Sequence, residues 1–280
     1  MKGTLLILDA TSSIGRALVQ VAVDSGRPVI AASLDYPALR ALKASHRGAD
    51  LALMPGSITD ESSSAALVAD LRELDRPIAG VIVAGCREPI RGRVLDQPDG
   101  ALQQAVADEV LPQLAAARAL VPLLAEGGRN GSYVVIGGPG GENPWAGYGL
   151  RSVTAAATRM LLRVMHDEAR AQSVRVQMLA VEMPVRTDQN AERACAQWPT
   201  AIAIAERALA LLDHAGSREP AEAIVRYAWH ATPPLSAAPE RRAVHGHRPA
   251  ETPRLLEDTW AALKPMLAPD SIDSTNNKKA

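Results

Sequence analysis

Tyr148 combines a proton-transferring side chain with a position at the start of a long predicted helix. A phenol can exchange a proton with a carbonyl or alcohol oxygen, but unassisted it is a weak base at neutral pH. Arg151, three residues further on, lies on a neighbouring face of the helix and can assist it only through its charge. No lysine can assist, because the five lysines are at positions 2, 43, 264, 278 and 279.

A glycine-rich segment offers a second kind of chemistry. Residues 137–141 read GGPGG and directly follow a predicted strand. Backbone N–H groups in such a loop can bind an anion or a developing negative charge on oxygen. Together with Tyr148 and Glu109, this segment would suit a catalyst that transfers no hydride. The alternative interpretation is an ordinary loop after a strand.

Metal and thiol chemistry have little support in the sequence. His245 and His247 form an HGH pair, which supplies two ligands and does not complete a metal site. Cys86 and Cys195 are far apart and form no CxxC pair, so we interpret both as free thiols in a reducing compartment, with Cys86 buried and inert. We therefore predict no metal site.

Residues 5–20, LLILDATSSIGRALVQ, predict a strand, a tight turn and a helix. Turns of this kind place the N–H groups at a helix start against a phosphate, and glycine allows the close approach. Here Gly15 is the only glycine, and Asp9 adds a negative charge. The alternative interpretation is that residues 11–13 simply cap the helix.

Predicted strands and helices alternate along the chain. The strands are rich in Val, Ile and Leu without alternation, as expected for a parallel sheet covered on both faces. This order predicts right-handed βαβ units in a doubly wound α/β fold, with Tyr148 near the carboxyl ends of the strands. The predicted strands are 4–8, 28–33, 50–53, 80–84, 132–136 and 175–180. The predicted helices are 14–24, 36–44, 60–74, 107–125, 149–171 and 200–214.

The composition argues against several function classes. A net charge of −1 over 280 residues gives no basis for binding nucleic acid, and 3% aromatic residues without any Phe disfavour a base-stacking surface. The longest apolar runs are interrupted within about ten residues, which is too short to span a bilayer. The first residues lead into a strand and do not form a signal peptide. We expect a cytoplasmic protein with no nucleic-acid or membrane partner.

The chain divides into two predicted parts. Residues 1–235 carry the strand–helix alternation, and residues 236–280 form a C-terminal extension that follows a change to Pro- and Ala-rich sequence. Residues 253–267 predict one amphipathic helix, and the polar residues 268–280 predict a disordered tail.

Three landmarks occur in one order: IGRAL after the first turn, AG after the fourth strand, and a tyrosine at the start of the helix after the fifth. In this order the chain resembles the short-chain dehydrogenase/reductase family over roughly residues 1–230. The resemblance implies a Rossmann-like parallel sheet of about seven strands in the order 3-2-1-4-5-6-7. It also implies an oxidoreductase that uses NAD or NADP on a carbonyl or alcohol.

The family's cofactor motifs are altered in this chain. Its turn, T-G-x-x-x-G-x-G, corresponds to residues 8–15, where Asp9 and Ser13 replace two of three glycines. The residue that selects NAD or NADP falls at Ser33, which leaves Arg16 as the nearest base for a 2′-phosphate, and we interpret Asp35 as a helix cap. If a cofactor binds, the resemblance places it at Ser13, Ile14, Gly15, Ser33, Ser57, Ala84, Gly85 and Thr187.

The family's catalytic group is altered even more. Its Asn, Ser, Tyr and Lys fall at Glu109, Gly138, Tyr148 and Ser152, so only the tyrosine remains. Loss of general acid–base assistance alone costs roughly 10²- to 10⁴-fold in rate. We predict that NADH and NADPH bind weakly or not at all, with dissociation constants above about 100 μM.

Three functions follow from these replacements. The first is a non-catalytic protein that binds a ligand or serves as the partner subunit of an active relative. The second is a divergent NAD(P)-dependent oxidoreductase acting through Tyr148. The third is the non-redox catalyst described above. Small apolar residues on the helices 107–125 and 149–171 predict a homo-oligomer, or a hetero-oligomer with an active relative.

Overall fold

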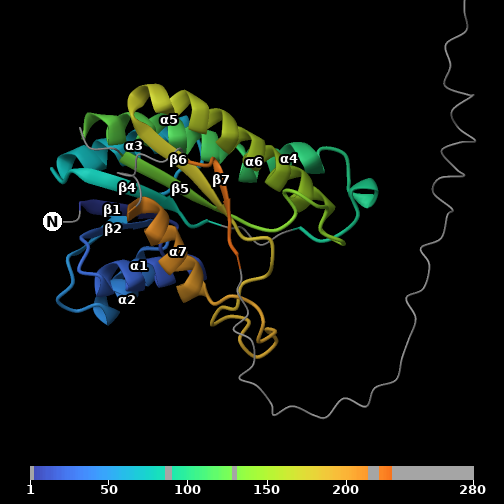
Figure 1. Ribbon diagram of the computed structural model, residues 1–280, viewed down its shortest axis with the longest axis horizontal. Helices are drawn as coiled ribbons and strands as arrows, with labels where there is room; N and C mark the ends of the chain where they lie inside the picture. The colour runs from blue at the N-terminus through green and yellow to red at the C-terminus, as the bar shows by residue number, and fades with distance from the viewer. Residues whose placement is uncertain (1–2, 86–89, 128–130, 214–220, 229–280) are drawn as a thin grey trace, which may run out of the picture. The chain divides into compact units, whose positions relative to one another are not determined.

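The computed structural model describes residues 3–85, 90–127, 131–213 and 221–228. Seven parallel strands form one sheet in the order β3-β2-β1-β4-β5-β6-β7, which confirms the predicted fold (Figure 1). The strands are β1 Thr4–Leu8, β2 Val29–Ser33, β3 Leu51–Pro55, β4 Ile78–Val83, β5 Gly131–Gly137, β6 Val174–Ala180 and β7 Ile224–Arg226. The α-helices are α1 Ser13–Asp24, α2 Tyr36–Ser45, α3 Glu61–Glu73, α4 Ala101–Glu109, α5 Leu111–Glu126, α6 Gly149–Ala169 and α7 Ala201–Asp213. Two short 3₁₀ helices are η1 Val94–Asp96 and η2 Arg170–Gln172.

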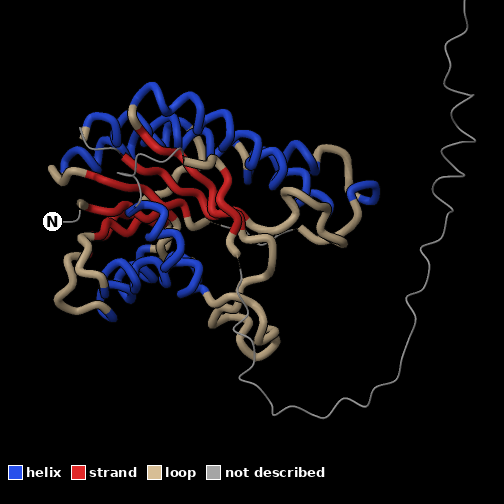
Figure 2. The backbone as a smooth tube through the Cα atoms, viewed as in Figure 1, coloured by secondary structure: helices blue, strands red, loops and turns tan. Residues whose placement is uncertain are grey.

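Helices cover both faces of the sheet (Figures 1 and 2). Successive residues of β1 serve the two faces in turn, because side chains alternate along a strand. Leu6 and Leu8 belong to the core beneath α3, α5 and α6, whereas Leu5 and Ile7 belong to the core against α1, α2 and α7. This double burial explains the strands' continuous apolar sequence.

The predicted single helix over residues 107–125 is wrong in its extent. The chain forms α4 and α5 there, with a break at Val110. Pro112 lies in the first turn of α5, where its missing N–H needs no partner, and a proline disfavours continuous helix through the residues before it. The break leaves Glu109 as the last residue of α4.

Side-chain caps begin four of the described helices, and at α7 the Ala203 N–H donates to Thr200 Oγ1 over 3.1 Å. The Gly15 N–H donates to Ser12 Oγ over 3.0 Å at the start of α1, so this residue of the TSS segment does cap the helix. The Ala38 N–H donates to Asp35 Oδ1 over 2.9 Å, which confirms Asp35 as a cap. Asp60 forms a capping box with Ser63, and the hydrogen bonds from Ser63 lower the pKa of the Asp60 carboxyl.

Several predictions concern residues that lie outside the described ones. The residues concerned are Cys86, His245, His247 and the C-terminal extension, for which a helix over residues 253–267 and a tail over residues 268–280 were predicted. Of the helices that the structure describes, none combines the length and the apolar character needed to cross a membrane. The described His, Cys, Asp and Glu side chains form no group of three placed to hold a metal ion.

Candidate active site

A cavity of about 340 Å³ opens at the carboxyl ends of the central strands. Its apolar floor includes Val83 at the end of β4, Val135 on β5 and Met178 on β6. Three glycines of the predicted anion-binding loop border it, Gly137, Gly138 and Gly141. Its volume is at the lower end of the range for small-molecule sites, which is about 300–1,000 Å³.

A buried ion pair stands in one wall of this cavity. The Arg151 guanidinium donates to the Glu109 carboxylate over 2.8 Å, and both side chains are only about one-tenth exposed. The Thr154 hydroxyl, one turn further along α6, donates to the same carboxylate oxygen over 2.6 Å. These contacts join the break between α4 and α5 to the first turns of α6.

A second ion-pair network also borders the cavity, two turns further along α6. Arg159, which is buried on α6, donates to Glu182 over 2.7 Å and lies 3.5 Å from Glu142. Glu142 also pairs with Arg226 of β7. The network therefore ties α6 to the loop after β5, to the end of β6 and to β7.

Tyr148 is not among the described residues that line the cavity. Its ring stacks on Trp145 with the centroids 4.2 Å apart, and the Arg91 guanidinium lies 5.8 Å from the ring centre. Ser152 is buried and structural: its hydroxyl accepts from the Trp145 N–H over 2.8 Å and donates to the Tyr148 carbonyl over 3.0 Å. The α6 residues that border the cavity are Arg151, Ala155, Thr158 and Arg159.

Asp9 occupies a backbone conformation that favours glycine. Its φ is +54°, and Asp is one of the few side-chain-bearing residues that tolerate this region. Its carboxylate lies against Gly85 at the end of β4, where an added Cβ would come within 1.9 Å of Asp9 Oδ2. Gly15 must also be glycine, because a Cβ there would lie 2.2 Å from the Asp9 carbonyl oxygen.

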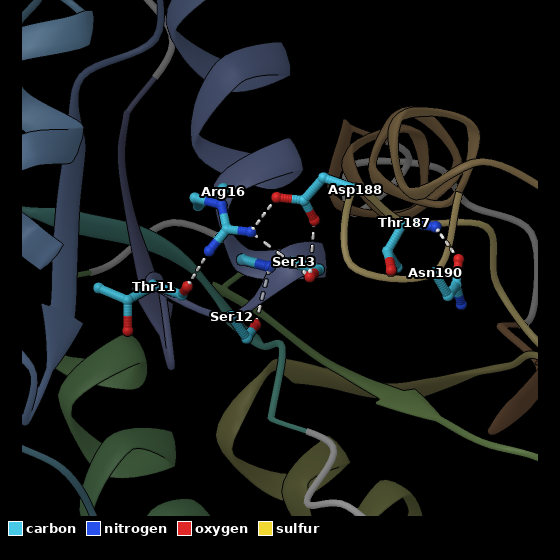
Figure 3. A network of polar contacts seen from close by, with 8 residues as sticks. Thr11, Ser12, Ser13, Arg16, Thr187, Asp188 and Asn190 are labelled. Atoms are coloured by element: carbon cyan, nitrogen blue, oxygen red, sulfur yellow. Dashed lines mark hydrogen bonds and ion pairs between the residues drawn. The ribbon is translucent and has the colours of Figure 1, made fainter. Parts of the chain in front are cut away.

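The start of α1 is occupied by an acidic side chain from far along the sequence (Figure 3). Asp188, in the loop after β6, accepts from Ser13 Oγ over 3.0 Å and from Arg16 over 2.6 Å. Desolvation opposes ionisation, but the Ser13 hydrogen bond and the charge of Arg16 outweigh it and lower the pKa of the Asp188 carboxyl. Arg16 also donates to the Thr11 carbonyl over 2.7 Å.

The other predicted cofactor-binding residues lie around the cavity and around the start of α1. Ser57 and Gly85 border the cavity, whereas Ala84 is buried in the core beside the sheet. Ser33 is buried and hydrogen-bonds to Thr11 over 2.7 Å. The Thr187 N–H donates to Asn190 Oδ1 over 2.8 Å within the loop that carries Asp188. Ile14 is partly buried against the core beneath α1.

The structure thus brings Glu109, Gly138, Ser57 and Gly85 to one cavity and leaves Tyr148 and Ser152 outside its lining. Four residues with contacts at these sites were not predicted from the sequence: Thr154, Arg159, Glu182 and Asp188. Two of these carry a signal in the sequence, because Thr154 and Arg159 recur on the Arg151 side of α6 at helical spacing.

Comparison with known proteins agrees with the fold. Residues 9–226 match the family model described as enoyl-(acyl carrier protein) reductase. No curated protein matches the sequence. A short-chain oxidoreductase from Pseudomonas aeruginosa PAO1 containing an atypical catalytic center has a similar apo structure, with a TM-score of 0.72 and 16% identity, covering 82% of this chain and 97% of that one. Its NADPH-bound structure has a TM-score of 0.68 and 18% identity, covering 75% and 89%.

A short-chain type dehydrogenase/reductase from Mycobacterium ulcerans is also similar, with a TM-score of 0.69 and 22% identity, covering 80% of this chain and 87% of that one. At these identities the structural likenesses show the fold alone. The fold is that of an α/β protein with a doubly wound, Rossmann-like parallel sheet. The family model spans most of the chain, and the chain therefore belongs to the short-chain dehydrogenase/reductase family.

Proposed function

We propose that this chain is a ligand-binding member of its family. It does not carry out the family's hydride transfer, in which a tyrosine assisted by a lysine exchanges the proton. It acts as a binding protein or as the partner subunit of an active relative. The observation that carries this proposal is the Glu109–Arg151 pair, which occupies the cavity wall beside α6. An arginine cannot release a proton at neutral pH, so it cannot serve as the acid of a carbonyl reduction.

The surroundings of Tyr148 support the same proposal. Its ring is engaged with Trp145 and Arg91, and among the described residues it does not border the cavity. The cavity-facing side of α6 carries no lysine near Arg151. The next α6 residue that borders the cavity is Ala155. A small polar ligand suits the cavity best, because its lining combines two ion pairs with apolar side chains.

A second candidate function is a divergent NADPH-dependent oxidoreductase. One observation favours it: a protein of similar fold contains an atypical catalytic center and binds NADPH. In that function, Glu109 is the candidate acid or base, because it is the carboxylate in the cavity wall that touches both Arg151 and Thr154.

The test combines calorimetric titration with NADH and NADPH, an assay of NADPH oxidation with a set of aldehydes and ketones, and native mass spectrometry of the purified protein. We expect dissociation constants above about 100 μM, no oxidation above the uncatalysed rate, and a bound small molecule in the wild type. The doubly substituted Glu109→Gln/Arg151→Met variant should lose that molecule.

The matched control is Glu126→Gln/Arg72→Met, which removes an exposed ion pair outside the cavity and should keep the ligand. Low-micromolar NADPH binding with turnover would establish the second candidate. In that case, Tyr148→Phe and Glu109→Gln would show which side chain supplies the proton.

A further inference from the structure

The described lining of the cavity carries more negative than positive charge. Its ionisable side chains are four carboxylates and two guanidiniums: Asp9, Asp108, Glu109, Glu182, Arg151 and Arg159. Arg151 pairs with Glu109. Arg159 pairs with Glu182, so both guanidiniums already have a carboxylate partner in the lining. Charges interact more strongly in a partly desolvated cavity than in water, and this lining therefore favours a cationic ligand. The diphosphate of a dinucleotide has the opposite charge and does not fit it.

Asp108 is a carboxylate of this lining that has no counter-charge among the described residues. It lies in the last turn of α4 and is half-buried, and no described residue forms a hydrogen bond or an ion pair with its side chain. The dipole of a helix favours positive charge at its C-terminal end, so an unpaired carboxylate there is unfavourable on two counts. Glu109, the next residue, has Arg151 as its partner. A cation from outside the chain would do the same for Asp108.

The break between α4 and α5 adds further oxygen acceptors. Pro112 has no N–H to donate to the Asp108 carbonyl four residues earlier. The Gln113 N–H donates to the Val110 carbonyl over 3.1 Å, three residues back, whereas the helical pattern would direct it to Glu109. The Gln113 amide oxygen is removed from water and accepts no hydrogen bond from the described residues. All of these residues except Val110 border the cavity. The break therefore gathers acceptors whose usual donors are missing.

We propose that the cavity binds a small organic cation, a primary alkylamine in its ammonium form, with the ammonium group at the α4–α5 break beside Asp108. An ammonium group has a positive charge, three N–H donors and no acceptor, which matches the charge and the acceptors of the break. The alkyl part would lie on the apolar floor formed by Val83, Val135 and Met178.

An organic cation suits the break better than a metal ion, because the described His, Cys, Asp and Glu side chains form no group of three placed to hold a metal. The inference rests on the proposed function, since it names the ligand class of the same cavity. It concerns only the charge and the donors of the ligand, which can be varied independently in small probe molecules.

The test measures the binding of three probes to the dialysed full chain by calorimetry: n-butylammonium chloride, sodium butyrate and tetramethylammonium chloride. Butyrate has a similar alkyl part with the opposite charge, and tetramethylammonium keeps the positive charge without any N–H donor. We expect butylammonium to bind at least about tenfold more tightly than either of the other two, because it alone supplies both the charge and the donors.

Two pairs of variants locate the site. Asp108→Asn should weaken butylammonium binding about tenfold, since it removes the unpaired charge. The matched control is Asp99→Asn, at an exposed carboxylate just before α4 and outside the described lining, and it should stay within about twofold of wild type. Gln113→Leu should weaken binding about threefold, with Gln104→Leu on the exposed side of α4 as its control. Urea unfolding shows that each variant is folded.

Equal affinities of Asp108→Asn and Asp99→Asn for butylammonium would overturn the amine site. Absence of butylammonium binding, a preference for butyrate, or binding of Ca²⁺ in place of butylammonium would overturn it as well. Each of these results would leave the proposed function intact, because the cavity could still bind another ligand. Failure of the proposed function would show in a different experiment, as NADPH oxidation by the wild type in an assay that contains no amine.

Discussion

The carboxylate of Glu109 lies 2.8 Å from the guanidinium of Arg151, and the pair is almost wholly removed from water. The two residues come from the break between α4 and α5 and from the first turn of α6. Burying two charges is costly unless each has a partner and further hydrogen bonds, and Thr154 supplies one of these to Glu109. The cavity wall should therefore be destabilised when one member of the pair is removed and the other stays charged.

Removing one member of this pair should destabilise the protein strongly. Arg151→Met takes the charged partner from a buried carboxylate that keeps its hydrogen bond from the Thr154 hydroxyl, and we expect the free energy of unfolding to fall by about 3 kcal/mol. Glu109→Gln/Arg151→Met should recover most of this loss, because no charge then remains. Urea unfolding measures both values, with Arg72→Met as the control at an exposed ion pair, where the expected change is below about 1 kcal/mol.

Asp9 and Gly85 offer a separate test of the turn after β1. In Gly85→Ala the new Cβ would lie 1.9 Å from Asp9 Oδ2, so the carboxylate must move. We expect a loss of about 1–2 kcal/mol in the free energy of unfolding. In the Asp9→Gly background the loss should fall to less than half, and glycine also suits the left-handed φ at position 9.

Gly56→Ala is the control for this prediction, because a Cβ there meets only Leu67 Cδ1 at 3.4 Å. Its cost should be similar with and without Asp9. An equal cost of Gly85→Ala in both backgrounds would contradict the placement of the Asp9 carboxylate.

Tyr133 should be replaceable by phenylalanine with a gain in stability. The side chain is fully buried on β5, and its hydroxyl has no hydrogen-bond partner among the described residues. Burial of an unpaired hydroxyl is unfavourable, so Tyr133→Phe should raise the free energy of unfolding by about 1 kcal/mol. Thermal and urea unfolding would measure this, with Tyr36→Phe as the exposed control.

The same substitution should change the response to alkaline pH. Burial raises the pKa of Tyr133 well above the ordinary tyrosine value of 10.0, so the native protein keeps this phenol neutral while the unfolded chain ionises it. The contribution to stability is constant below pH 10 and declines above it. Tyr133→Phe should therefore lose less stability than wild type between neutral pH and pH 11, although Tyr227, whose pKa is also raised by burial, remains.

Six of the seven strands could be predicted from sequence because each is a short apolar run, whereas the seventh strand and the strand order came from the family resemblance. Three of the helices begin at side-chain caps that the sequence shows. The caps at Ser12, Asp35 and Asp60 lie next to the helices that they begin, and such contacts are local in sequence. The break at Val110 also has a local signal in Pro112, although residues 107–125 were predicted as one continuous helix.

The site was harder to predict because its contacts join distant parts of the chain. Asp188 accepts a hydrogen bond from Arg16, which lies 172 positions earlier in the chain. Arg159 on α6 donates to Glu182, which follows β6. Tyr148 and Arg151 are only three residues apart, yet Arg151 lines the cavity and Tyr148 is not among its described lining residues. The Ser152 hydroxyl ties the preceding loop to the first turn of α6, and this contact has no signature in the sequence.

The orientation of α6 leads to a prediction of gained activity. Arg151 and Ala155 are four residues apart and both border the cavity, so they lie on one face of the helix. We expect Glu109→Asn/Arg151→Tyr/Ala155→Lys to place a phenol and an ammonium there without leaving a buried carboxylate unpaired. The lysine can favour the phenolate and hold a cofactor hydroxyl, which a proton transfer in this cavity requires.

The variant should bind NADPH more tightly than wild type and reduce simple aldehydes above the uncatalysed rate. Glu109→Asn/Arg151→Tyr/Ala156→Lys is the matched control, because Ala156 is exposed and its lysine faces away from the cavity lining. Calorimetry and the loss of NADPH absorbance measure the two effects. Equal behaviour of these two variants would show that the cavity-facing side of α6 is not where the family's chemistry can be restored, and would return attention to Tyr148.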